Sequence, residues 1–161
     1  MLLRASKVPV SVRLLLPIAE NSVSDRSLRP GDVIYARNGK STEVTNTDAE
    51  GRLLLADALC LACEAPMGPG WTKPRVIFDF ATLTGAARVA LGEELPALFS
   101  NSPTELLELG NISRIVGDDL WPMPLWKPLS AAVRGSRVAD LLNSVDGLVH
   151  ADTTSFFDTF C

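Results

Sequence analysis

The sequence predicts an α/β fold with a mixed, mostly parallel sheet flanked by helices. Apolar strand-like runs alternate with Leu- and Ala-rich helical runs, and the run Arg75–Phe80 passes directly into a helical pattern. Such alternation is typical of parallel strands joined by right-handed helical crossovers. The chain has 161 residues, of which 47% are apolar. One domain with its own core is expected, since domains most often run to about 100–150 residues.

The first half of the chain begins with a predicted buried strand at Val10–Ile18, whose Val10, Val12, Leu14 and Leu16 alternate onto one face. Four local elements follow in order: a turn at Pro30-Gly31-Asp32, a strand at Val33–Ala36, a hairpin turn at Asn38-Gly39 and a returning strand at Thr42–Val44. The Leu- and Ala-rich stretch Arg52–Cys63 predicts a helix buried on most sides, broken by the prolines and glycines after Ala65.

The second half begins with another predicted buried strand, Arg75–Phe80, which leads into a helix ended by Gly92. Ser102 is a favourable N-cap and Pro103 a favourable first helical residue, so a helix is expected to begin there. The remaining expectations are a short strand at Ala97–Ser100, an irregular segment WPMPLWKP and a helix at Trp126–Val133.

Composition and charge argue against several classes of protein. The formal net charge is −4, which disfavours nucleic-acid binding, and Pro17 interrupts the longest early apolar run well short of a membrane span. The N-terminus lacks the features of a secretory signal. Cys60 and Cys63 form one CxxC in a helical context, which favours small buried side chains over a zinc site. We therefore expect a cytoplasmic protein without membrane or nucleic-acid partners.

The segment Asn46–Arg52 carries the most chemistry. Asp48 and Glu50 would project to one side if the backbone there were extended, with Arg52 at the start of the following helix. Carboxylate oxygens suit Mg²⁺, Mn²⁺ or Zn²⁺, and an arginine can stabilise developing negative charge. Thr47-x-x-Glu50 is also a capping box, and the spacing alone favours this structural interpretation.

The segment NTDAEGRLLLADAL resembles the signature of the leucyl (cytosol) aminopeptidase family of two-metal exopeptidases. LPIAEN, RPGDVI and ATLTGAARVALG occur in the same order as in that family, so the resemblance runs from Val10 to about Asn143. It implies that Asp48 ligates one metal ion, that Glu50 bridges two, and that Arg52 acts with a bound bicarbonate. The implied metals are Zn or Mn, with Mg as an alternative. The implied substrates are peptides, and the implied assembly is a homo-oligomer, a hexamer in the family.

The resemblance further implies that Thr82, Leu83 and Gly85 line the substrate cleft, with the Leu83 carbonyl accepting a bond from the peptide. A tight strand-to-helix turn capped by Thr82 or Thr84 explains the same residues, and both interpretations can hold together. The family's other metal ligands and its catalytic lysine have no counterpart here, and Lys7 stands in no matching motif. We expect residues 1–143 to be a partial catalytic domain and residues 144–161, with the lone His150, an unmatched tail.

Two functions follow from these observations. The first is a two-metal aminopeptidase that releases leucine-like N-terminal residues, with this chain carrying only part of the site. The alternative is a catalytically inactive fragment or pseudo-subunit that acts in assembly, because an incomplete sheet leaves an edge that seeks a partner. In both cases the 161-residue chain by itself is expected to be nearly inactive, since too few ligands offset the dehydration of the metal ions.

Overall fold

The computed structural model describes residues 7, 9–20, 22–64, 70, 72–83, 85–145 and 160, and it has an α/β fold. One sheet has the strand order β1-β2-β5, and a second pairs β3 with β4. The β1–β2 pairing is antiparallel, whereas β2–β5 and β3–β4 are parallel, so the described pairings are mostly parallel, as predicted. In chain order the elements are β1 (Val33–Tyr35), β2 (Ser41–Glu43), the 3₁₀ turn η1 (Thr47–Ala49), α2 (Gly51–Cys63), α3 (Ala86–Leu91), β3 (Ala97–Leu98), α4 (Pro103–Val116), β4 (Trp121–Pro122), α5 (Lys127–Val133) and β5 (Leu141–Leu142).

The two turns around the β1–β2 hairpin form as predicted. At the entry, Gly31 adopts a φ of 92° and its N–H donates to the Val44 carbonyl at 2.7 Å. At the tip, Gly39 adopts a φ of 83° and its N–H donates to the Ala36 carbonyl at 2.8 Å. A positive φ is strained for residues with a side chain, which explains glycine at both points.

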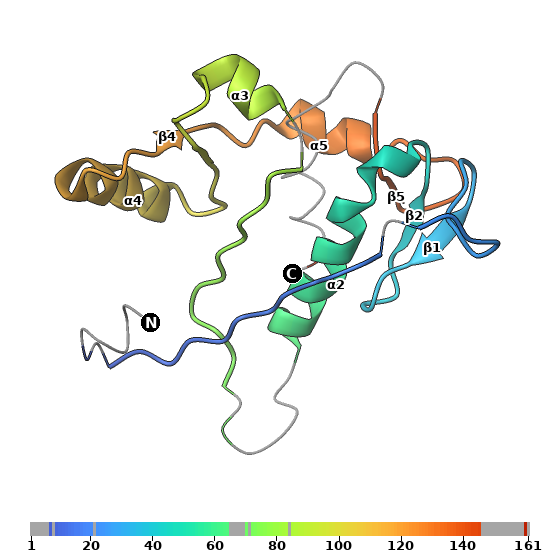
Figure 1. Cartoon of the computed structure of the whole chain (residues 1–161), viewed down its shortest axis with the longest axis horizontal. Helices are drawn as coiled ribbons and strands as arrows, with labels where there is room; N and C mark the ends of the chain where they lie inside the picture. The colour runs from blue at the N-terminus through green and yellow to red at the C-terminus, as the bar shows by residue number, and fades with distance from the viewer. Residues whose placement is uncertain are drawn as a thin grey trace.

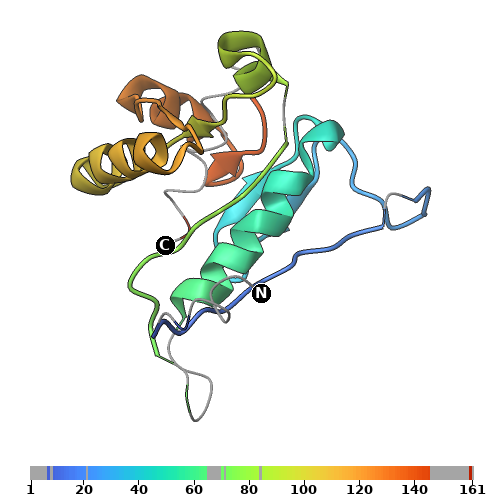
Figure 2. The ribbon, with the colours of Figure 1, turned by 60° about the vertical axis from the view of Figure 1, so that its left-hand side comes forward.

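Helix α2 forms over the predicted stretch and packs beside the three-stranded sheet (Figures 1 and 2). The core cluster joins side chains from α2, α5 and β5 with a residue near the C-terminus: Ala56, Cys60, Val133, Leu141 and Phe160. Burial raises the pKa of the Cys60 thiol, which favours the neutral form expected of a small core residue. Cys60 is thus confirmed as a core residue.

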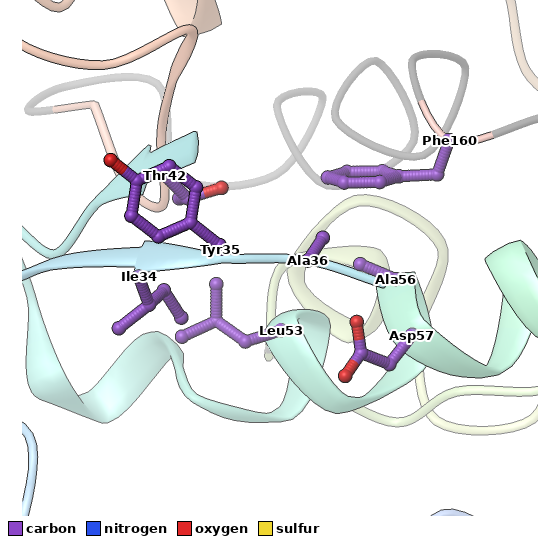
Figure 3. A pocket seen from close by; sticks show the side chains of 8 residues that line it. All are labelled: Ile34, Tyr35, Ala36, Thr42, Leu53, Ala56, Asp57 and Phe160. Carbon is purple, nitrogen blue, oxygen red and sulfur yellow. The ribbon is translucent and has the colours of Figure 1, made fainter. Parts of the chain in front are cut away.

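A small hollow lies between the β1–β2 hairpin and α2 (Figure 3). Its lining is mostly apolar and includes Ile34, Leu53 and Ala56, with Phe160 covering one side. Because Leu53, Ala56 and Phe160 also belong to or pack against the core cluster, the hollow is a gap in core packing.

Helices α3, α4 and α5 form near their predicted positions. Ser102 caps α4 by accepting a hydrogen bond from the Glu105 N–H at 3.3 Å, and Pro103 is the first helical residue. Gly92 ends α3 with a φ of 90°. The sequence pattern did not predict β4 or β5, because strands of two residues are too short to show an alternating pattern.

The two predicted buried strands are wrong for the described structure. Residues 9–18 and 75–80 run as extended chain without strand pairing, visible as the dark blue and green traces in Figures 1 and 2. Their apolar side chains are largely exposed: Leu14 is 76% and Phe80 is 89% exposed. Alternating apolar residues encode a strand only when neighbouring strands cover them. Elsewhere in the described residues, α4 connects the parallel strands β3 and β4, as the expected helical crossovers do.

Some sequence-based expectations fall outside the described residues. These are the helix-breaking segment 65–69, Thr84, and most of the predicted tail, including His150. Within the described residues, no helix is long and apolar enough to cross a membrane.

Candidate metal and substrate site

Residues Asn46–Glu50, here called the acidic turn, fold as a helical turn between β2 and α2. The Asn46 side chain accepts a hydrogen bond from the Asp48 N–H at 2.9 Å, which starts the 3₁₀ turn η1. Glu50 follows with helical angles (φ −77°, ψ −35°), and α2 begins at Gly51. The backbone is therefore not extended. The condition under which the two carboxylates would project to the same side is not met. Successive residues of a 3₁₀ turn are separated by about 120° around its axis.

The capping-box interpretation of Thr47 and Glu50 is also wrong. The side chain of Asn46 is the one that caps η1, and Glu50 occupies the N-cap position of α2 without a side-chain cap bond. The carboxylates of Asp48 and Glu50 both belong to exposed residues. The turn therefore presents two carboxylates to solvent at the start of a buried helix.

Arg52 lies in the first turn of α2, as predicted, and is buried, with only 4% of its surface exposed. Its guanidinium stays positively charged at all ordinary pH values. Salt screens the interactions of a buried charge less than those of a charge on the surface. Arg52 thus places a fixed positive charge two residues after Glu50.

The segment predicted to line the substrate cleft contacts the start of α2, where Leu83 meets Gly51. A Cβ atom at Gly51 would lie 2.6 Å from Cδ2 of Leu83, so the Leu83 side chain packs directly against this glycine. Leu83 precedes α3, and the next described residue, Gly85, is the N-cap of that helix. The structure thus brings Leu83 to Gly51, between Glu50 and Arg52, and Thr82, Leu83 and Gly85 are all exposed residues. The N-cap position of α3 is Gly85 and not Thr82, and Thr84 lies outside the described residues.

Asn143 also contacts the acidic turn, and the sequence analysis did not assign it to the site. Its side chain accepts a hydrogen bond from the Thr45 N–H at 2.8 Å and donates one to the Asn46 carbonyl at 2.6 Å. The only sequence signal was its position at the end of VADLLN, a segment within the family resemblance.

The donor set fits part of a metal site. Asp48 and Glu50 offer the oxygen ligands that Mg²⁺, Mn²⁺ and Zn²⁺ accept in proteins. Across the described part of the chain, no group of three or more His, Cys, Asp or Glu side chains could hold a metal ion. The described residues therefore offer carboxylate oxygens that suit a divalent cation but do not form a complete set of metal ligands.

Two exposed carboxylates on a turn before a buried arginine, in an α/β fold, form a candidate metal site. The model of the cytosol aminopeptidase family, catalytic domain, matches residues 1–161. The chain belongs to this family.

The relatives of the chain agree with this assignment. It is 46% identical over 137 residues to the cytosol aminopeptidase of Xenopus tropicalis, covering 85% of this chain and 25% of that protein. The crystal structure of the Coxiella burnetii cytosol aminopeptidase matches with a TM-score of 0.87 and 43% identity, over 99% of this chain and 34% of that one. The bottromycin maturation enzyme BotP, solved in complex with Mn, matches with a TM-score of 0.71 and 35% identity, over 83% and 28%. The chain thus spans about a quarter of the length of the curated relatives it matches.

Proposed function

We propose that this chain is part of a two-metal aminopeptidase that releases N-terminal, leucine-like residues from peptides. The observation that carries the proposal is the turn itself: exposed Asp48 and Glu50 directly precede buried Arg52, and Leu83 packs at Gly51 between them. Family membership supports the reaction class. The remaining ligands are proposed to come from residues of the complete protein outside this set.

Asp48 and Glu50 are the residues proposed to hold the metal ions, with Glu50 shared between both. When bound, such a pair activates water as a nucleophile and polarises the scissile carbonyl. Mn is supported by the complex of BotP, and Zn and Mg suit the same oxygen ligands.

Arg52 is proposed to stabilise the negative charge that develops on the substrate oxygen, together with a bound bicarbonate. Its burial favours this role, because a preorganised charge shielded from water stabilises a transition state more than a mobile surface charge does.

The peptide is proposed to bind along the chain before α3. The Leu83 carbonyl would accept a hydrogen bond from the peptide, and Thr82 and Gly85 would border the pocket for the N-terminal side chain. The packing of Leu83 against Gly51 supports this placement, since it joins the peptide-binding segment to the start of the helix that carries Arg52.

The relatives are named cytosol aminopeptidases, which supports a cytoplasmic protein, and a homo-oligomer follows from the family resemblance. A second candidate is a catalytically inactive subunit that acts in assembly. The exposed apolar residues of segments 9–18 and 75–80 would be covered by a partner subunit in this case and by the rest of the catalytic domain in the first.

Hydrolysis of Leu-p-nitroanilide by the protein at its natural length tests the proposal. We expect activity that is lost with a chelator, restored by Mn²⁺, and reduced at least about a hundredfold by Glu50→Gln, since the shared ligand is removed. Glu94→Gln, which changes an exposed carboxylate before β3, serves as the control and should retain activity. An active protein that resists the chelator and tolerates Glu50→Gln would contradict the proposal, and an inactive protein would favour the assembly function.

A further inference from the structure

Asn143 is a fully buried polar residue, with 0% of its surface exposed, directly after β5. A buried amide costs free energy unless its donors and acceptor are all paired. The side-chain partners of Asn143 lie in residues 45–49, the segment that leads into the acidic turn.

The two ends of the Asn143 amide bind different backbone groups of that segment. Its Oδ1 accepts hydrogen bonds from the N–H groups of Thr45 at 2.8 Å and Asn46 at 3.2 Å, and from the Thr45 hydroxyl at 3.2 Å. Its Nδ2 donates to the carbonyl oxygens of Asn46 at 2.6 Å and Ala49 at 3.3 Å. Only an amide side chain of this length offers the acceptor and both donors together.

These bonds fix the chain on both sides of Asp48. Ala49 lies between Asp48 and Glu50, so the bond to its carbonyl holds the peptide unit between Ala49 and Glu50. Asn46, held through both its N–H and its carbonyl, in turn accepts the Asp48 N–H with its own side chain at 2.9 Å. One amide therefore determines the course of the backbone through the turn.

Strand β5 delivers Asn143 to this point. The Asn143 backbone N–H donates to the Glu43 carbonyl at 3.0 Å, which extends the parallel pairing of β5 with β2. Three residues earlier, Asp140 accepts hydrogen bonds from the Ser41 N–H at 2.8 Å and hydroxyl at 2.7 Å. Asp140 thus anchors the strand that carries Asn143 to the acidic turn.

We propose that Asn143 is a positioning residue for the metal-ligating turn: its amide holds residues 45–49 so that Asp48 and Glu50 keep a fixed relative placement. The inference rests on the proposed function for its metal-binding consequence. Its structural part, the fixation of the turn by one side chain, can be measured without any metal.

Hydrogen exchange of the backbone amides tests the structural part, comparing the wild-type chain with Asn143→Ala. The reporters are the Thr45 and Asn46 amides, which donate to Asn143 Oδ1. We expect their exchange to accelerate about tenfold or more in the variant, whereas the amides of α2 stay protected. Ser113→Ala is the matched control, because it removes a buried hydroxyl that bonds the Gly110 carbonyl and the Leu120 N–H far from the turn in sequence, and exchange at the Thr45 and Asn46 amides should match the wild type. Unchanged exchange in Asn143→Ala, or equal acceleration throughout α2 and the β1–β2 hairpin, would overturn the proposal.

Mn²⁺ binding followed by electron paramagnetic resonance tests the metal part, with the same substitutions made in the protein at its natural length. Partners that orient metal ligands typically contribute about 10–100-fold in metal affinity, so Asn143→Ala should weaken Mn²⁺ binding by that range and Ser113→Ala should not. Wild-type affinity in folded Asn143→Ala would overturn the positioning role. Unchanged Mn²⁺ affinity in Glu50→Gln would instead refute the proposed function. The exchange experiment would still decide whether Asn143 holds the turn.

Asn143→Ser covers the case in which the alanine variant does not fold. Serine keeps a polar atom at the buried position but is too short to reach the partners on both sides of the turn. The same acceleration at Thr45 and Asn46 and the same weakening of Mn²⁺ binding are expected, and wild-type values of both would again overturn the proposal.

Discussion

Gly51 lies between Glu50, the proposed metal ligand, and Arg52, the proposed catalytic residue. The Leu83 side chain packs against Gly51. The contact is close because glycine has no Cβ. A Cβ at this position would meet a methyl group at the end of the flexible Leu83 side chain. The Glu50–Arg52 segment and the peptide-binding segment are therefore coupled through a side chain that can move.

Gly51→Ala tests this coupling. We expect the Leu83 methyl signals to shift in NMR spectra while the free energy of unfolding changes by less than about 1 kcal/mol, because Leu83 can rotate away and alanine favours the helix. Gly85→Ala is the matched control, since a Cβ at Gly85 meets nothing within 4 Å. Unmoved Leu83 methyl signals in Gly51→Ala would show that the contact does not exist.

Leu141, 1% exposed, belongs to the core cluster that joins β5 to α2 and α5. Leu141→Ala should lower the free energy of unfolding by about 2–5 kcal/mol, because it removes apolar contacts and leaves a cavity. Val138→Ala, at a position 67% exposed three residues earlier, should change it by less than about 0.5 kcal/mol. Urea denaturation measures both, and equal effects would contradict the assignment of Leu141 to the core.

Residue identities in the site were predicted further than residue geometry. The carboxylates Asp48 and Glu50 and the position of Arg52 were read from the sequence, but the extended backbone and the capping box expected there were wrong. The reason is that the Asn46 side chain and the distant Asn143 together select a helical turn. A residue 97 positions away in the chain cannot be recognised from local spacing.

Among the elements, β5 depends on an ionised side chain for one of its attachments. Hydrogen bonds from the Ser41 N–H and hydroxyl lower the pKa of Asp140 below its ordinary value of 3.8. A carboxyl whose pKa is lower in the folded state stabilises the fold above its ordinary pKa and loses this contribution as pH falls through the folded value.

Asp140→Asn should therefore lower the urea midpoint at pH 7, and the difference from wild type should shrink as the pH falls below about 4. Asp118→Asn, which changes an exposed carboxylate after α4, is the control and should show no such pH-dependent difference. A difference that persists unchanged at pH 2 would mean that the Asp140 charge does not hold β5.

Elements set by local chemistry were predicted well, and elements set by distant pairing were not. The turns at Gly31 and Gly39 and the cap at Ser102 each depend on residues within a few positions, and all three formed. Segments 10–18 and 75–80 carry strand patterns, but a strand also requires a neighbour, and none pairs with them in the described residues. The pattern specifies which residues seek burial and does not by itself supply the covering surface.

At the scale of the whole molecule, the main feature is apolar surface left uncovered along residues 9–18 and 75–80. The chain spans about a quarter of its curated relatives, and these side chains have the alternation of strands inside a sheet. Exposed strand-like segments of this kind pair readily with other chains.

We expect the 161-residue chain to self-associate in size-exclusion chromatography with light scattering. Leu14→Ser combined with Leu16→Ser should shift it toward monomer with little change in thermal midpoint, because the two side chains are 76% and 70% exposed. Val138→Ser, at a position 67% exposed between α5 and β5, is the control and should leave association unchanged. A wild-type chain that elutes as a monomer would contradict this expectation.

Anomalous X-ray diffraction from crystals of the protein grown with Mn²⁺ tests whether Asp48 and Glu50 hold metal. We expect a manganese peak within coordination distance of the Asp48 and Glu50 carboxylates, and its loss in Glu50→Gln crystals grown in the same way. Peaks only at other positions, or a peak at the acidic turn that persists in Glu50→Gln at full height, would contradict it.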